Sequence, residues 1–200
     1  MSISDRDGIR GAGSRRLRRP ERREQILAAA TEAFATGGFA ATGLDDVAAA
    51  AGVSRVILYR HFDSKTDLYR SVLARARARL AAAVGGPDYT EEIIDTLLSA
   101  ASADPAGFRL LFHHASREPD FRAEMDQFRD FMVATARTQL AGLIPDRSWA
   151  DWAAHLVPTA TVHAILAWLD AGEPEPATAA PRIRHAVTGV IAAARLSPSG

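Results

Sequence analysis

The sequence has no cysteine among its 200 residues, and Lys65 is its only lysine beside 23 arginines. The lack of cysteine excludes disulfides and thiolate metal sites, and it leaves the redox compartment undetermined. No apolar stretch follows the arginines near the start of the chain, so a secretory signal is not indicated.

Long uncharged runs are also scarce. One of them, residues 152–169, has 18 residues and reaches the lower limit for a membrane span. It contains Pro158 and two histidines, and aspartates bracket it on both sides. We therefore expect a buried helix in a cytoplasmic protein that makes no membrane contact.

The charges that are present are unevenly distributed. The net charge is zero, but residues 1–70 hold 12 basic side chains against 9 acidic ones, and residues 14–23 alone contain six arginines. Such a run is either a solvated tail or a local contact with a polyanion, and composition alone does not decide between them.

The hydrophobic pattern predicts an all-α fold, because apolar residues recur at helical spacing and alternating stretches are lacking. Gly37 and Gly38 are expected to end the first helix, and Ser54 and Ser64 to cap the third and fourth. The expected helices span about 20–36, 44–51, 55–62, 65–84, 89–103, 105–117, 119–143, 148–171 and 178–196. We expect a flexible arginine-rich arm at 1–19, a helix-turn-helix DNA-binding domain at 20–70, and a helical ligand-binding and dimerisation domain at 71–200.

Residues 42–62 carry the helix-turn-helix pattern. Two short apolar segments flank Gly52, which permits a tight turn, and Val47 and Leu58 can form a small core between them. The second segment would then be a recognition helix in the major groove. Many helical hairpins share this pattern, so by itself it is a moderate indication.

The longer stretch 22–73 resembles the DNA-binding domain of the tetracycline-repressor (TetR) family. The matching features are the Ala-Gly-Val-Ser turn, the Leu-Tyr-Arg-His-Phe end of the recognition helix, and the Ser-Lys start of the next helix. The resemblance implies a homodimer that binds double-stranded, pseudo-palindromic operator DNA. It also implies that a small molecule relieves repression.

The resemblance assigns phosphate contacts to Thr42, Tyr59, His61 and Lys65, and such contacts supply affinity rather than sequence information. Base edges are expected to meet Arg55, Val56, Ile57 and Arg60. The chain departs from the family pattern at Val56 and Ile57, where small or polar residues are usual, and at Gly43. The alternative is that Ile57 and Val56 are core residues. The predicted minor-groove contacts of the arm come from Arg15, Arg16, Arg18 and Arg19.

Aromatic residues recur at helical spacing on several expected helices of the C-terminal domain, which indicates either an apolar ligand cavity or ordinary core. We expect a lipophilic or aromatic effector and no cofactor. The residues predicted to line its pocket are Phe108, Phe112, His113, Phe131, Trp152 and His155. No metal site is expected, because the histidines lack the close spacing of metal ligands.

In the family's arrangement the last two helices form the dimer surface as an intersubunit four-helix bundle. The predicted interface residues are Ile165, Trp168, Leu169, Ile183, Val187, Val190 and Ile191. The effector would tilt the long fourth helix and change the separation of the two recognition helices. We expect Arg75, Arg77 and Arg79 on that helix to be solvated.

Two alternatives remain. A DNA-binding regulator could respond to a protein partner and bind no small molecule. An enzyme could use His113, Glu118 and His155 as acid–base groups, although no nucleophile elbow, phosphate-binding glycine loop or metal motif supports this. The sequence does not identify the effector, the operator or the sign of regulation.

Overall fold

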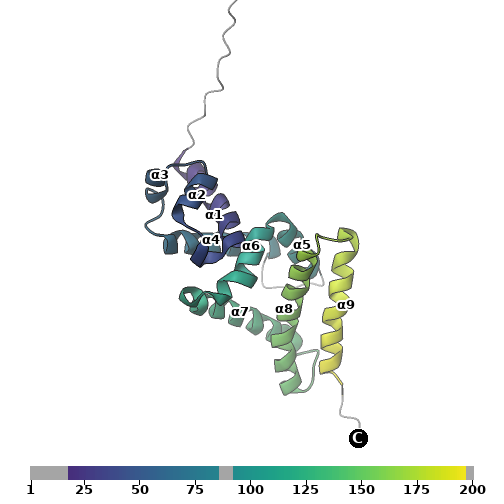
Figure 1. The fold of residues 1–200 in the computed structure, drawn as a ribbon. Coiled ribbons are helices and arrows are strands. Elements are labelled where there is room, and N and C mark those ends of the chain that lie inside the picture. The colour runs from purple at the N-terminus through teal and green to yellow at the C-terminus, as the bar shows by residue number, and fades with distance from the viewer. Residues whose placement is uncertain (1–17, 86–91, 197–200) are drawn as a thin grey trace, which may run out of the picture.

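The computed structural model describes residues 18–85 and 92–196, and the regular elements in these ranges are all helical, which confirms the all-α fold (Figure 1). Short π and 3-10 segments at Leu110–His114, Ala115–Arg117 and Pro119–Phe121 connect the sixth and seventh α-helices. The α-helices are α1 (Arg19–Ala41), α2 (Leu44–Ala50), α3 (Arg55–Tyr59), α4 (Lys65–Val84), α5 (Ile93–Ala103), α6 (Pro105–Arg109), α7 (Arg122–Leu140), α8 (Arg147–Asp170) and α9 (Pro176–Ala194).

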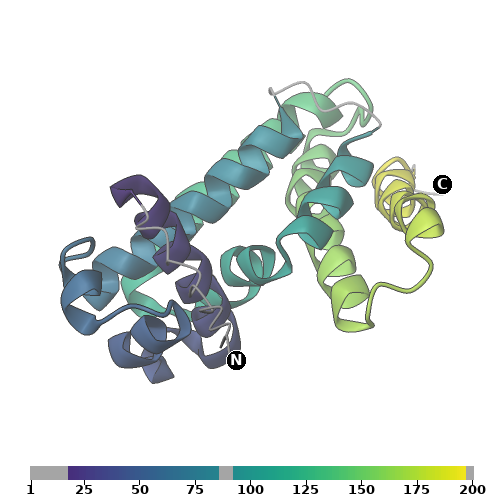
Figure 2. The same ribbon diagram turned by 90° about the horizontal axis from the view of Figure 1, so that it is seen from above.

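The long helix α4 connects the two halves of the molecule. In Figure 2 it runs from the N-terminal helices towards the C-terminal ones, while α8 and α9 lie side by side at the far end. Its predicted cap is confirmed: the Ser64 hydroxyl accepts a hydrogen bond from the Asp67 amide at 3.0 Å, and the Asp67 carboxylate accepts one from the Asp63 amide at 3.1 Å.

Two helices differ from the expected pattern. Gly38 leaves the helical conformation with φ +74°, but helical geometry resumes and α1 continues to Ala41. The predicted helix 105–117 consists of one α-helical turn, then a π-helical turn, then a 3-10 turn. A π turn holds one more residue than an α turn, so it rotates the side chains that follow it.

The first hydrophobic core crosses the expected domain boundary at residue 70. Side chains of α1 to α4, such as Phe34 and Tyr69, pack in one cluster with Leu110, Phe121 and Met125 from the C-terminal half. The N-terminal helices therefore share one hydrophobic core with part of the C-terminal half.

A second core joins α5 and α6 to α8 and α9, and a third joins α7 to α8. By length and composition α8 could cross a membrane. Here its apolar residues pack against neighbouring helices, with Ile165 and Ala153 fully buried. The protein core thus accounts for the buried apolar face of α8, while Trp149 and Trp152 near its start are exposed.

Candidate nucleic-acid interface

The predicted helix-turn-helix is formed by α2 and α3. Gly52 adopts φ +61°, a conformation that favours glycine, and turns the chain between the two helices. Val47, Leu58 and Phe62 are fully or almost fully buried, and Ser54 caps α3 by accepting a hydrogen bond from the Ile57 amide at 3.3 Å. One face of α3 is thereby fixed to the core, and the opposite face is left in solvent.

The solvent face of α3 carries the predicted base-reading residues. Arg55 and Arg60 are exposed, Val56 is 63% exposed and Tyr59 is 44% exposed. Ile57 is half-buried, so its exposure does not decide whether it is a core residue or a DNA contact. An isolated helix of five residues has little intrinsic stability, so packing through Leu58 is what presents these side chains.

Arg55 already has two side-chain contacts within the protein in the absence of DNA. Its Nη1 lies 3.0 Å from a carboxylate oxygen of Asp45 on α2, and its Nη2 lies 3.5 Å from the Tyr59 hydroxyl. The guanidinium also lies 5.6 Å from the centre of the Tyr59 ring. Sequence reasoning missed Asp45, because the turn at Gly52 brings it to Arg55 across ten residues.

The end of α3 shares its surface with the start of α1. His61 is half-buried, and burial, followed by the positive charges of Arg19, Arg23 and Arg22, lowers the pKa of its imidazole. Arg23 stacks on the Phe62 ring at 4.8 Å. Arg22 and Arg23 were not predicted as contact residues, although they belong to the arginine run at 14–23.

The other predicted arm residues are only partly described. Arg15 and Arg16 lie outside the described residues. The Arg18 guanidinium lies 2.8 Å from Glu21, and the Glu21 carboxylate also accepts the Arg18 amide at 2.8 Å at the start of α1. Its contact with DNA remains a prediction.

Thr42 and Lys65 both hold the connection between α1 and α2. Thr42 is buried, and its hydroxyl donates to the carbonyl oxygens of Gly38 at 2.8 Å and Ala33 at 3.2 Å. Since a hydroxyl has one hydrogen, donation to a phosphate would require Thr42 to break these bonds. The Lys65 ammonium donates to the Ala40 carbonyl at 3.1 Å, which leaves it two more hydrogens for a phosphate.

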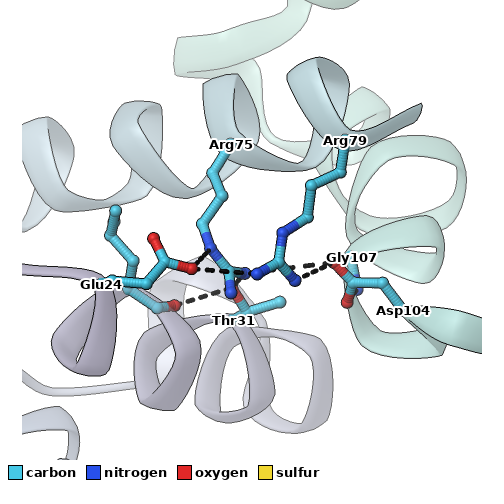
Figure 3. Close-up of polar contacts among 7 residues, drawn as sticks. Glu24, Thr31, Arg75, Arg79, Asp104 and Gly107 are labelled. Carbon is cyan, nitrogen blue, oxygen red and sulfur yellow. Dashed lines mark hydrogen bonds and ion pairs between the residues drawn. The ribbon is translucent and has the colours of Figure 1, made fainter. Parts of the chain in front are cut away.

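An interdomain ion-pair cluster of Glu24, Arg75, Arg79 and Asp104 connects α1, α4 and the start of α6 (Figure 3). A single Glu24 oxygen lies 2.7 Å from Arg75 and 2.9 Å from Arg79. Asp104 lies 3.2 Å from Arg79 and also accepts the Gly107 amide as the cap of α6. The expectation of solvated arginines is wrong for Arg75, whose side chain is only 11% exposed, and for Arg77, whose Nε and Nη2 are buried, while Arg79 is exposed.

Two cavities lie in the C-terminal half. One of about 220 Å³ lies between the π turn, α7 and α8, and Phe112, Phe128, Met132 and Val162 are among its lining residues. A second of about 290 Å³ lies between α4, α5 and α6, against Leu80 and Phe108.

The predicted pocket residues divide accordingly. Phe112 lines the first cavity and Phe108 the second. His113, Phe131, Trp152 and His155 are exposed and line neither of these cavities, because their side chains lie on the outer faces of their helices. Among the residues that the structure describes, no three His, Asp or Glu side chains gather as metal ligands.

The predicted dimer residues also need correction. Ile165, Leu169, Ile183 and Val187 are buried within this chain, in the core between α5, α8 and α9, and so cannot present their side chains to a partner. Trp168, Val190 and Ile191 are half-buried. The exposed positions in this part of α8 and α9 are instead mainly small or polar, such as Thr159, His163, Ala167, His185, Gly189 and Ala193, while Trp149 and Trp152 are exposed near the start of α8.

Comparison with known proteins points in the same direction as this geometry. Residues 26–72 match the sequence profile of the bacterial regulatory proteins of the tetR family. The chain is 35% identical over 128 residues to the HTH-type transcriptional activator FasR of Mycolicibacterium smegmatis, a match that spans 60% of this chain and 56% of FasR. It is 34% identical over 128 residues to an HTH-type transcriptional repressor of Streptomyces coelicolor, across 61% of this chain and 67% of that protein. The crystal structure of a TetR-like transcriptional regulator from Rhodococcus superposes with a TM-score of 0.77 at 23% identity, covering 88% of this chain and 99% of the other.

Proposed function

Because the chain belongs to the TetR family of DNA-binding transcriptional regulators, we propose that it is a ligand-responsive repressor that binds a pseudo-palindromic operator as a homodimer. The exposed face of α3 is the observation that carries this proposal. Val56 is 63% exposed and lies beside Arg55, Tyr59 and Arg60, so this face presents an apolar side chain, a phenol and two cations together. A thymine methyl group and guanine acceptors in the major groove would match that surface.

Phosphate contacts are proposed to surround this face. Tyr59 and His61 would contact DNA phosphates from the recognition helix and its end. Lys65 would contact a phosphate from the start of α4, where the helix dipole favours an anion. Arg19, Arg22 and Arg23 extend the basic surface beyond the recognition helix. Each neutralised phosphate makes operator binding weaker at higher salt concentration.

The cavity of about 220 Å³ is proposed as the effector site, and its lining indicates a small lipophilic or aromatic compound. Leu111 lines this cavity and also belongs to the core that contains α1 and α4. An occupant that shifts the π turn would therefore move α4 and change the spacing of the recognition helices, which must be near ~35 Å for successive major grooves. Release of DNA requires that the effector bind the shifted state more tightly.

The homodimer is proposed to form through the exposed faces of α8 and α9. Ala167, Gly189 and Ala193 leave room for close approach of helices, as an intersubunit four-helix bundle requires. The protein would act in the cytoplasm, where it meets chromosomal DNA.

Selection of genomic DNA fragments by the purified full-length protein tests this function. We expect enrichment of a short inverted repeat, and we expect Tyr59→Ala and Lys65→Ala to abolish it. Phe131→Ala is the matched control, because it removes an exposed aromatic side chain from α7. The proposal fails if no sequence is enriched, or if both interface variants bind as well as the parent protein.

The sign of regulation needs a second experiment, because one named relative is an activator and another a repressor. A promoter reporter that carries the enriched repeat should be silenced when the protein is expressed. Increased expression would indicate activation instead.

A further inference from the structure

We propose that Asp45 is a specificity-determining residue of the operator-binding surface, because it fixes Arg55 in the orientation in which Arg55 recognises guanine. This inference rests on the proposed function, since it requires that α3 enter the major groove. Asp45 itself need not touch DNA, and its role is to position Arg55.

The geometry holds Arg55 from two sides. Asp45 on α2 accepts a hydrogen bond from Nη1 at 3.0 Å, while Tyr59, one turn further along α3, contacts Nη2 at 3.5 Å. A guanidinium has five N–H donors in a rigid fork, and one contact at each terminal nitrogen leaves others free to donate. The oxygen and nitrogen acceptors of guanine in the major groove match two such donors.

Folding does not explain the Asp45–Arg55 pair. The two side chains are 70% and 59% exposed, and ion pairs exposed to this degree contribute little to stability. Asp45 is not the cap of α2, because the Gly43 amide donates to the neighbouring Asp46 at 2.8 Å. As a carboxylate in the first turn of α2, Asp45 gains only the modest stabilisation of the helix dipole.

The carboxylate also opposes DNA affinity, because it places a negative charge on the surface that faces phosphates. A carboxylate that reduces affinity for DNA and contributes only modestly to stability fits a role in selectivity. Without Asp45, the long Arg55 side chain could turn to any nearby phosphate and bind DNA of every sequence. With Asp45, part of the entropy of ordering Arg55 is lost before binding, so the guanine contact costs less to form.

The test measures specificity and affinity separately in the full-length protein. Sites are selected from random DNA, and Kd is measured at several salt concentrations for the selected operator, for operators with guanine replaced, and for unrelated DNA. The variants are Asp45→Asn, which keeps the shape and removes the charge, and Asp45→Ala. Asp63→Asn is the matched control, since it removes one exposed charge from the turn after α3 without altering the Arg55 ion pair.

We expect both Asp45 variants to lose about tenfold or more of the discrimination for guanine at one position in each half-site, within the range for one bidentate contact. Their affinity for unrelated DNA should increase severalfold. Asp63→Asn should keep the preference for guanine, and Arg55→Lys should lose it at the same position, because an ammonium lacks the planar fork.

The inference is overturned if Asp45→Asn keeps the parent's base preference, or if it weakens binding to all sequences equally. If Asp45→Asn keeps the base preference and the parent protein selects an operator, the role of Asp45 is rejected and the proposed function stands. A parent protein that selects no sequence would overturn both.

Discussion

His61 is the side chain through which we expect operator binding to depend on pH. Burial and three nearby arginines lower its pKa, so it is neutral in the free protein near pH 7. A phosphate beside it would raise the pKa, so the complex takes up a proton and the operator Kd decreases as the pH falls through the interval between the two pKa values. The change can reach at most about tenfold per pH unit for one proton.

Fluorescence anisotropy between about pH 8 and 5, the range in which histidine titrates, measures this effect. His61→Gln should flatten the profile, while the exposed His113→Gln in the C-terminal half should leave it unchanged. A parent profile that is already flat would show that His61 does not meet a phosphate.

The hydroxyl of Tyr69 destabilises the first core. Its ring packs within 5.0 Å of the ring centres of Phe34, Phe39 and Phe121, and within the described residues its buried hydroxyl has no hydrogen-bond partner. Burial raises the pKa of this phenol, so it remains neutral. Tyr69→Phe keeps the packing and removes the unsatisfied group, and we expect it to stabilise the protein by about 1 kcal/mol. Thermal unfolding measures this, and a lower Tm would reveal an unseen partner for the hydroxyl.

At the scale of helices, Arg75 and Arg79 show how burial changes the contribution of an ion pair to stability. Both pair with Glu24 and Asp104, but Arg75 is 11% exposed and Arg79 is 49% exposed. We expect Arg75→Ala to lower the free energy of unfolding by about 2 kcal/mol, between the limits for exposed and buried pairs. Arg79→Ala should cost less than about 1 kcal/mol. Urea unfolding of the two variants tests this, and equal losses would contradict it.

The sequence predicted the helices well where the signals are local. Ser54, Ser64 and Gly52 act within one helical turn of their partners, and each does what its residue type indicates. The π turn was not predicted, because Leu110–His114 has no helix-breaking residue and the extra residue is accommodated by packing on α1 and α4.

The site was harder to predict, because its contacts join separate helices. Ile165 on α8 and Ile183 on α9 each belong to an apolar helix face. The sequence pattern of such a face is the same whether it packs inside the subunit or against a second subunit. The arginines at 75, 77 and 79 look alike in sequence, but only the fold shows that Arg75 is enclosed. The Asp45–Arg55 pair depends on the turn between α2 and α3 in the same way.

At the scale of the whole molecule, Gly189 offers a test of the proposed dimer. It lies on the exposed face of α9, and a Cβ added there would meet nothing within 4 Å. Gly189→Arg should therefore fold normally but block close helix approach, giving a monomer that binds the operator at least about tenfold more weakly, because both half-sites no longer bind together. Gly142→Arg, at an equally open position after α7, is the control. Light scattering reports the mass, and a Gly189→Arg dimer would place the interface elsewhere.

The interior shared by α1, α4, Leu110 and Phe121 also limits how this regulator can be engineered or recombined. A fragment that ends after α4 would expose apolar surface that the intact chain covers, so it would not be a portable DNA-binding unit. A chimera that grafts these helices onto another sensor would fold only if the new partner supplied equivalent side chains beneath Phe39 and Tyr69. Changes in promoter recognition should therefore arise more readily through the exposed side chains of α3 than through exchange of the whole domain.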